Sequence, residues 1–183
     1  DEYEYFTMVD YVNNFSSNVN RIYDNDIPIW ITEVGYEETS LESESQKYGI
    51  SVGDFQTIAL ARTYISLFAL PNVASIFWYT YVNDTTGQQM AINEESKSVL
   101  RVISEALTGS IPIESERIIN SDGNPIENTF EYRFKRSDGK TILIFWKNQP
   151  EDVSYSAVVQ NLTGSPAYLY NLQEDVNGTG TRI

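Results

Sequence analysis

The sequence contains no histidine and no cysteine. Without histidine, this chain cannot form a Ser-His-Asp triad or a histidine-ligated zinc site. Without cysteine, it has no thiol nucleophile, no disulfide and no thiolate ligand for an iron–sulfur cluster. The groups that remain for covalent or acid–base catalysis are carboxylates, tyrosine, lysine, and serine without a histidine partner. Carboxylate chemistry is therefore the natural candidate, and we expect neither a cofactor nor a metal.

Basic residues are scarce, and long apolar runs are missing. The 183 residues include 12 Lys and Arg against 26 Asp and Glu, which gives a net charge of −14. Such a surface repels nucleic-acid phosphates and anionic membranes, so neither is an expected partner. No apolar run approaches the ~20 residues of a membrane helix, so we expect no membrane insertion. The charge suits a neutral ligand, and it also suits simple solubility. Hydrophobic residues make up 41% of the chain and aromatics 13%, which is typical of a globular protein.

Residues 27–36 (IPIWITEVGY) predict a buried strand that ends on a carboxylate. Their β-branched and aromatic side chains favour a pleated environment, and a nearly continuous apolar run suits a parallel strand covered on both faces. Glu33 interrupts this run shortly before Gly35, where the chain is free to turn. Active sites of parallel α/β folds lie at the C-terminal ends of the strands. Glu33 is therefore the leading catalytic candidate. The alternative is a strand-end glutamate in a surface salt bridge.

Helices and strands alternate over the first 110 residues. We expect helices at about 4–24, 51–70 and 94–107, strands at 27–36 and 73–81, and a long acidic loop at 37–48. Ser51 and Asp54 form a capping-box variant at the start of the second helix. This order favours parallel βα units. Two strands cannot close a sheet, and a (β/α)₈ barrel needs about 250 residues, so the pattern predicts an incomplete α/β domain.

After Gly109, two-residue alternation replaces the helical period. Phe130, Tyr132 and Phe134 alternate in a strand at 128–135, and Ser137-Asp138-Gly139 signals a hairpin to a strand at 141–146. Further strands are expected at 153–159 and 167–172. Phe145 and Trp146 are expected to lie in the core of this part, with a carbohydrate-binding platform as the alternative. The change of period predicts a domain boundary near Ile111, between an α/β part and an all-β part.

Taken in order, these segments resemble the end of a clan A glycoside hydrolase. Residues 30–36 (WITEVGY) look like the seventh strand of its (β/α)₈ TIM barrel, which carries the nucleophile in a Thr-Glu-hydrophobic-Gly-aromatic stretch. Residues 76–79 (IFWY) resemble the eighth strand, whose Trp forms the floor of the sugar site. Further resemblances are Gln56 in the intervening helix, Asn83-Asp84 after the second strand, and Lys97, Leu100 and Leu107-Thr108-Gly109 in the last helix. The β part resembles the sandwich appended to many such barrels.

The resemblance implies a C-terminal portion of a TIM-barrel catalytic domain at 1–110 and a β-sandwich accessory domain at 111–183. It implies a retaining β-glycosidase that acts by double displacement on an oligo- or polysaccharide, with two carboxyl groups about 5–5.5 Å apart. Glu33 would be the nucleophile. Trp78, Tyr36, Asn83 and Asp84 would bind substrate, although Trp78 is equally explained as a core residue and the Asn-Asp pair by turn chemistry.

The family's acid/base glutamate and the tyrosine that supports its nucleophile have no counterpart here. We expect them on the remainder of the barrel, which lies upstream on the same polypeptide or on another chain. One alternative is a non-catalytic carbohydrate-binding or cell-surface structural protein derived from such a barrel. Another is an all-β adhesion module with an unrelated α/β neighbour, which would place Glu33 on an exposed edge. If the glycosylation sequons are used, the protein is extracellular or at the cell surface; they lie at Asn14, Asn83, Asn161 and Asn177.

Overall fold

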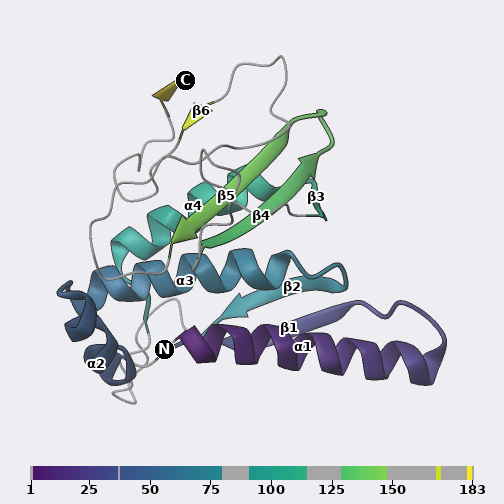
Figure 1. Ribbon diagram of the computed structural model, residues 1–183, viewed down its shortest axis with the longest axis horizontal. Coiled ribbons are helices and arrows are strands. Elements are labelled where there is room, and N and C mark those ends of the chain that lie inside the picture. Colours follow the sequence, from purple (N-terminus) through teal and green to yellow (C-terminus); the bar gives the residue numbers. More distant parts are fainter. Residues whose placement is uncertain are drawn as a thin grey trace, which may run out of the picture.

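The chain has a mixed α/β fold with two separate main sheets (Figure 1). The computed structural model describes residues 2–36, 38–79, 91–114, 129–147, 168–169 and 181–182. The helices are α1 (Glu2–Tyr23), α2 (Glu38–Tyr48), α3 (Val52–Phe68) and α4 (Glu94–Leu107). The strands are β1 (Ile29–Val34), β2 (Val73–Trp78), β3 (Ser110–Ile113), β4 (Thr129–Arg136), β5 (Thr141–Lys147), β6 (Tyr168–Leu169) and β7 (Thr181–Arg182). No closed barrel is seen among these residues.

The predicted parallel unit is confirmed. β1 and β2 pair in parallel, with Ile31 opposite Ile76 and Val34 opposite Trp78. The helix expected between them is α3, which follows α2 in the connection. Ser51 caps α3 by accepting a hydrogen bond from the backbone N–H of Asp54, 3.0 Å away, as the capping box requires. The end of the strand predicted at 73–81 falls partly outside the described residues.

The prediction of a loop at 37–48 was wrong, because α2 occupies most of it. α2 is mainly polar, but Leu41 is only 4% exposed and packs with Phe55 and Ala59 of α3. Tyr48, two turns further on, stacks on Phe55 with 5.6 Å between ring centroids. Two anchors at helical spacing are enough to hold an acidic helix, because most helical stability in proteins comes from tertiary packing.

The prediction that β1 is covered on both faces was also wrong for the described residues. Ile31 and Ile76 pack with Val73 into a cluster that α1 and α3 complete. In contrast, Trp30 is 63% exposed and Phe77 48% exposed, with their ring centroids 6.1 Å apart. Helices therefore bury one set of sheet side chains and leave a pair of large aromatic rings in contact with solvent.

The antiparallel sheet has the order β3-β4-β5, and the predicted hairpin joins its last two strands. Gly139 takes the left-handed conformation (φ +87°) in the three-residue turn, as such hairpins require. The strand predicted at 153–159 lies outside the described residues, and β6 represents a short part of the one predicted at 167–172.

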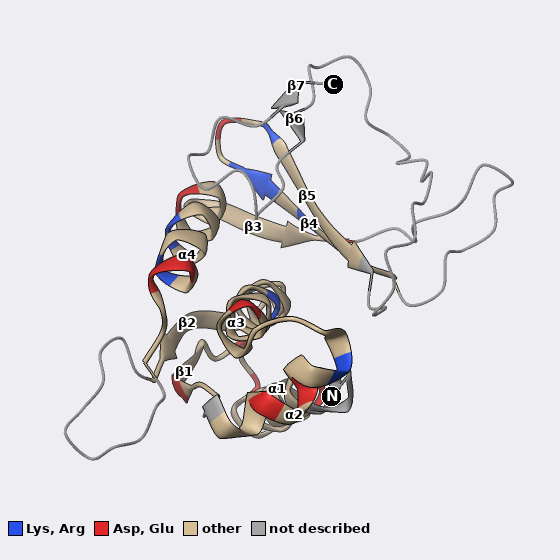
Figure 2. Ribbon diagram, turned by 90° about the vertical axis from the view of Figure 1, so that its left-hand side faces the viewer, with Lys and Arg blue, Asp and Glu red and all other residues tan. Residues whose placement is uncertain are grey.

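α3 and α4 pack against this sheet, so the two parts of the chain share one hydrophobic core. In Figures 1 and 2, α3 lies between the parallel pair and the antiparallel sheet. Phe134 of β4 is fully buried and packs with Ile65 of α3 and Ile103 of α4. The core therefore extends across the boundary predicted near Ile111.

A row of stacked rings adds to this contact. Trp146 stacks on Phe130 and on Tyr132, with centroid distances of 5.6 and 5.2 Å, and the guanidinium of Arg62 lies 5.6 Å from the Trp146 ring. The prediction that both aromatic residues of β5 lie in the core holds only for Trp146, because Phe145 is 45% exposed. Successive side chains of a strand point to opposite faces, so one of the two had to leave this core.

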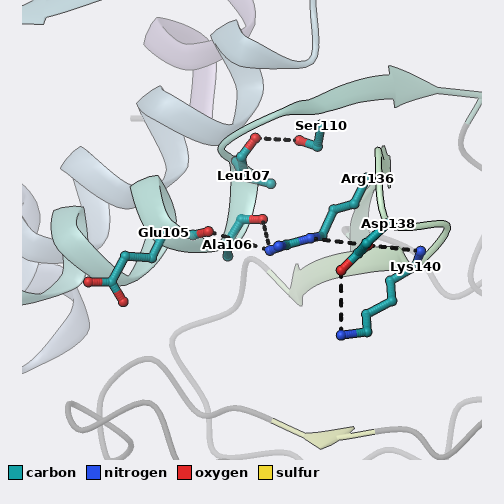
Figure 3. A network of polar contacts seen from close by, with 7 residues as sticks. All are labelled: Glu105, Ala106, Leu107, Ser110, Arg136, Asp138 and Lys140. Carbon is teal, nitrogen blue, oxygen red and sulfur yellow. Dashed lines mark hydrogen bonds and ion pairs between the residues drawn. The ribbon is translucent and has the colours of Figure 1, made fainter.

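The C-terminal end of α4 is held to the hairpin by Arg136 (Figure 3). Its Nη1 donates hydrogen bonds to the carbonyl oxygens of Ala106 (3.0 Å) and Glu105 (3.5 Å), which the helix leaves without intrahelical partners. Asp138 in the turn pairs with Arg136 (3.4 Å) and with Lys140 (3.5 Å). The positive guanidinium also lies at the negative end of the helix dipole, which stabilises this arrangement.

Replacing Phe134 should destabilise the fold much more than replacing Phe145. Phe134→Ala removes a fully buried ring from the shared core and should lower the free energy of unfolding by about 3–5 kcal/mol. Phe145→Ala, on the other face of the same sheet, should cost about 1 kcal/mol or less. Urea denaturation of both variants measures the difference. Equal losses would show that the shared core is not where the sheet gains its stability.

Asp138 should make stability depend on pH in the acid range. The backbone N–H of Lys140, followed by the charge of Arg136, lowers the pKa of the Asp138 carboxyl below its ordinary value of 3.8. As the pH falls, the Asp138 carboxyl therefore takes up a proton in the unfolded chain before it does so in the folded protein. The stabilisation from Asp138 is fully present above the pKa of the unfolded chain, and it is lost as the pH falls through the lower pKa of the folded protein. Between pH 6 and pH 3, Asp138→Asn should lose less unfolding free energy than the wild type. An equal loss in both proteins contradicts this role.

Candidate functional site

Glu33 lies one residue before the C-terminal end of β1, beside the end of β2 that carries Trp78. Val34 pairs with Trp78, and the backbone N–H of Tyr79 donates to the carbonyl of Val34 at 2.8 Å. Parallel pairing thus brings the two strand ends together, as expected from the sequence. Glu33 is exposed, and within the described part of the chain it forms no hydrogen bond or ion pair. The surface salt bridge offered as its alternative role is therefore not formed with the described residues.

Trp78 is packed between two tyrosines. Its ring centroid lies 5.8 Å from that of Tyr36 in a tilted arrangement and 6.2 Å from that of Tyr64 in a stacked one. Its indole Nε1 is buried and has no hydrogen-bond partner among the described residues. A buried N–H without a partner costs about 1–3 kcal/mol, so this donor is available to an acceptor that reaches it.

Tyr36 connects the end of β1 to α3. Its hydroxyl lies 3.1 Å from the hydroxyl of Thr63, which is only 1% exposed, while its ring faces Trp78. Burial raises the pKa of the neighbouring Tyr64 hydroxyl above its ordinary value, and a hydrogen bond from the backbone of Trp78 acts in the opposite direction. Tyr64 therefore remains neutral at physiological pH and serves as a packing partner.

Asn83 and Asp84 lie outside the described residues. No cluster of three or more acidic residues that could hold a metal occurs in the described part. A hollow of about 160 Å³ lies at the other end of the sheet, where Ile29 and Val73 begin β1 and β2 and α1 supplies Asn13 and Ser16. Because Glu33 stands at the C-terminal end, this hollow is separate from the candidate site.

Sequence reasoning did not identify Tyr64 as part of the site, nor the exposed pair of Trp30 and Phe77. The helical spacing of α3 pointed only to its apolar positions, and Tyr64 lies between them. No local pattern would have found Tyr64, because its contact with Trp78 depends on how α3 crosses β2.

The described helices include none long and apolar enough to cross a bilayer.

Removing the Tyr36 hydroxyl should loosen the tether between the end of β1 and α3. Tyr36→Phe should lower the free energy of unfolding by about 0.5–1.5 kcal/mol, because the buried Thr63 hydroxyl loses this partner. Tyr48→Phe is the matched control, since the Tyr48 hydroxyl makes no hydrogen bond to the described residues and its ring stays stacked on Phe55. Thermal or urea denaturation should separate the two variants. If they are equally stable, the tether contributes nothing.

The chain was also compared with known proteins. No family model, no curated protein and no solved structure gives a significant match. The interpretation of the site therefore depends on its own residues, on their geometry, and on the resemblance in sequence motifs described above.

Proposed function

We propose that this chain is the C-terminal part of a retaining β-glycoside hydrolase that acts on an oligo- or polysaccharide. Residues 1–110 would be the last units of its (β/α)₈ barrel, and residues 111–183 an appended β-sandwich. The remainder of the barrel would carry the acid/base residue. An extracellular or cell-surface location would follow from use of the sequons.

One observation carries this proposal. Glu33 is exposed and has no partner among the described residues, and it stands at the C-terminal end of a parallel strand whose neighbour ends on Trp78. Catalytic groups of (β/α)₈ enzymes come from the C-terminal ends of different strands. An exposed carboxylate in this place is accessible to a ligand and could act as a nucleophile.

The packing of the parallel pair supports a barrel origin. Helices α1 and α3 cover Ile31 and Ile76, as the outer helices of a barrel cover its strands. Trp30 and Phe77 are exposed instead. Layers of large side chains fill the interior of a (β/α)₈ barrel, so this aromatic pair suits packing against strands that the rest of the protein would supply. Those strands would also satisfy the open edges of the two-stranded sheet.

The chemistry would follow the two-carboxylate scheme. Glu33 would attack the anomeric carbon while the acid/base residue protonates the leaving oxygen, so that the glycosidic bond breaks and a glycosyl-enzyme forms. Water, deprotonated by the same acid/base residue, would then release the sugar and free Glu33. Trp78 packs against Tyr64 of α3, on the helix-covered side, so together with Tyr36 it would border the sugar site at the rim of the strand ends and not from the barrel interior. A neutral sugar is compatible with the net charge of −14.

A non-catalytic role is the second candidate, because the exposure of Glu33 fits it as well as it fits the enzyme. A glutamate on an open sheet edge is also what an adhesion module or an inactive carbohydrate-binding barrel would have. These candidates and the enzyme predict different results when the charge of Glu33 is removed.

In the complete protein, Glu33→Gln should lower the turnover of an aryl β-glycoside by on the order of 10³-fold or more, because an amide cannot form the glycosyl-enzyme. Its unfolding midpoint should stay close to that of the wild type, since the Glu33 side chain is exposed. Glu105→Gln makes the same change of charge at a side chain that is 68% exposed on α4, and it should retain full activity.

Hydrolysis by Glu33→Gln at the wild-type rate would reject Glu33 as the nucleophile. A complete wild-type protein that binds oligosaccharides but hydrolyses none would instead support the carbohydrate-binding alternative. Failure to bind any sugar would leave the adhesion module as the better explanation.

A further inference from the structure

The hollow of about 160 Å³ at the N-terminal end of the parallel pair has a lining of two kinds. Val12, Ile29 and Val73 are buried and form an apolar wall. The other wall is polar, and no charged side chain is among the residues that line the hollow. A cavity of about 150 Å³ accommodates a six-membered ring, whereas drug-sized ligands need about 300 Å³ or more. The hollow is therefore large enough for one small ring compound.

Hydrogen bonds between separate elements hold the walls of the hollow in place. Asn72 Nδ2 donates to Ser16 Oγ at 2.8 Å, which ties the turn before β2 to α1. The carbonyl of Asn72 accepts from the N–H of Ile29 at 2.7 Å, which ties the same turn to β1. Asn20 Oδ1 accepts from the N–H of Ile27 at 3.1 Å and fixes the chain as it enters β1. A preformed site of this kind loses less conformational entropy when a ligand binds.

Several polar groups of the lining keep hydrogen-bonding capacity for a ligand. Ser16 is only 8% exposed, and its hydroxyl accepts from Asn72 but donates to no described residue. Asn72 Oδ1 accepts from no described residue either. The exposed side chains of Asn13 and Ser17 also line the hollow, and they make no hydrogen bond within the described part of the chain. A buried hydroxyl without an acceptor is unfavourable, so this wall gains from a ligand that brings its own hydroxyl groups.

We infer that this hollow binds a neutral, hydroxylated ring of the size of one sugar unit. An anion does not suit it, because no basic side chain lines it and the net charge is −14. A calcium or magnesium ion is normally held by carboxylates, and none lines it. A wholly apolar ring would bury the Ser16 hydroxyl without an acceptor. A sugar ring instead places C–H groups on the apolar wall and hydroxyls on the polar one. The inference does not depend on Glu33, which lies at the opposite end of β1.

The test titrates the complete protein with D-glucose, D-galactose and D-mannose and follows binding by saturation-transfer NMR. At least one of these sugars should bind with a Kd on the order of 1 mM. Asn13→Ala removes an amide at an exposed helical position that tolerates alanine, and it should raise this Kd by about twofold to tenfold. Asn18→Ala is the matched control, because Asn18 is an exposed asparagine of the same helix that does not line the hollow. It should leave the Kd unchanged. The uronate of the same sugar should bind at least about tenfold more weakly, because its carboxylate meets no basic group.

Glu33→Gln separates this site from the proposed active site, because it should leave the Kd of the sugar unchanged. Affinity that falls in Glu33→Gln but not in Asn13→Ala would place the sugar at the strand ends and overturn the inference. Equal losses in Asn13→Ala and Asn18→Ala would overturn it too, as would a wild-type protein that binds none of the three sugars. Equal binding of the sugar and its uronate would show that the site does not select a neutral ligand. A complete protein that hydrolyses no glycoside contradicts only the proposed function.

Discussion

The burial of α3 is the constraint on which the rest of this structure depends. Most of its residues from Phe55 to Leu67 are buried, on more than one side of the helix. Leu67 packs towards α1 and the parallel strands, Ala59 towards α2, and Ile65 towards α4 and the antiparallel sheet. A helix that is apolar around most of its circumference is stable only when neighbours cover it on several sides. α3 therefore determines how the α/β part and the β part lie relative to one another.

The candidate site follows from this arrangement. α3 and α1 cover one side of the parallel pair and hold β1 and β2 in place. Because the two strands are parallel, with Val34 opposite Trp78, both end at the same edge of the sheet. There the Glu33 side chain is in contact with water, where a carboxyl group without a protein partner costs little. In contrast, the large ring of Trp78 is half-buried and packs against Tyr64 of α3 and Tyr36. One strand end thus presents an exposed carboxyl side chain, and its neighbour an aromatic ring whose N–H has no partner among the described residues.

Polar contacts add specificity that apolar packing does not provide. Apolar clusters tolerate sliding of one helix along another, whereas a buried hydrogen-bond network is satisfied in one register only. Gln56, Thr57, Asn93 and Ser96 fix the start of α4 against α3. Arg136 fixes its end to the β4–β5 hairpin. α4 is thereby held at both termini, which explains how a single helix links the two parts of the chain in a defined orientation.

Local patterns in the sequence were sufficient to predict α1, α3 and α4, the parallel strands and the hairpin, because periodicity, the Ser51 cap and the turn at Gly139 act within a few residues. They also placed Glu33 and Trp78 at neighbouring strand ends, since parallel pairing follows from the helix–strand order. Tertiary structure decided the rest. α2 is a helix because Leu41 and Tyr48 find partners on α3, Trp30 is exposed because no described element covers it, and Trp78 contacts Tyr64 because α3 crosses β2 at that level. Such contacts join residues distant in sequence, and no local pattern records them.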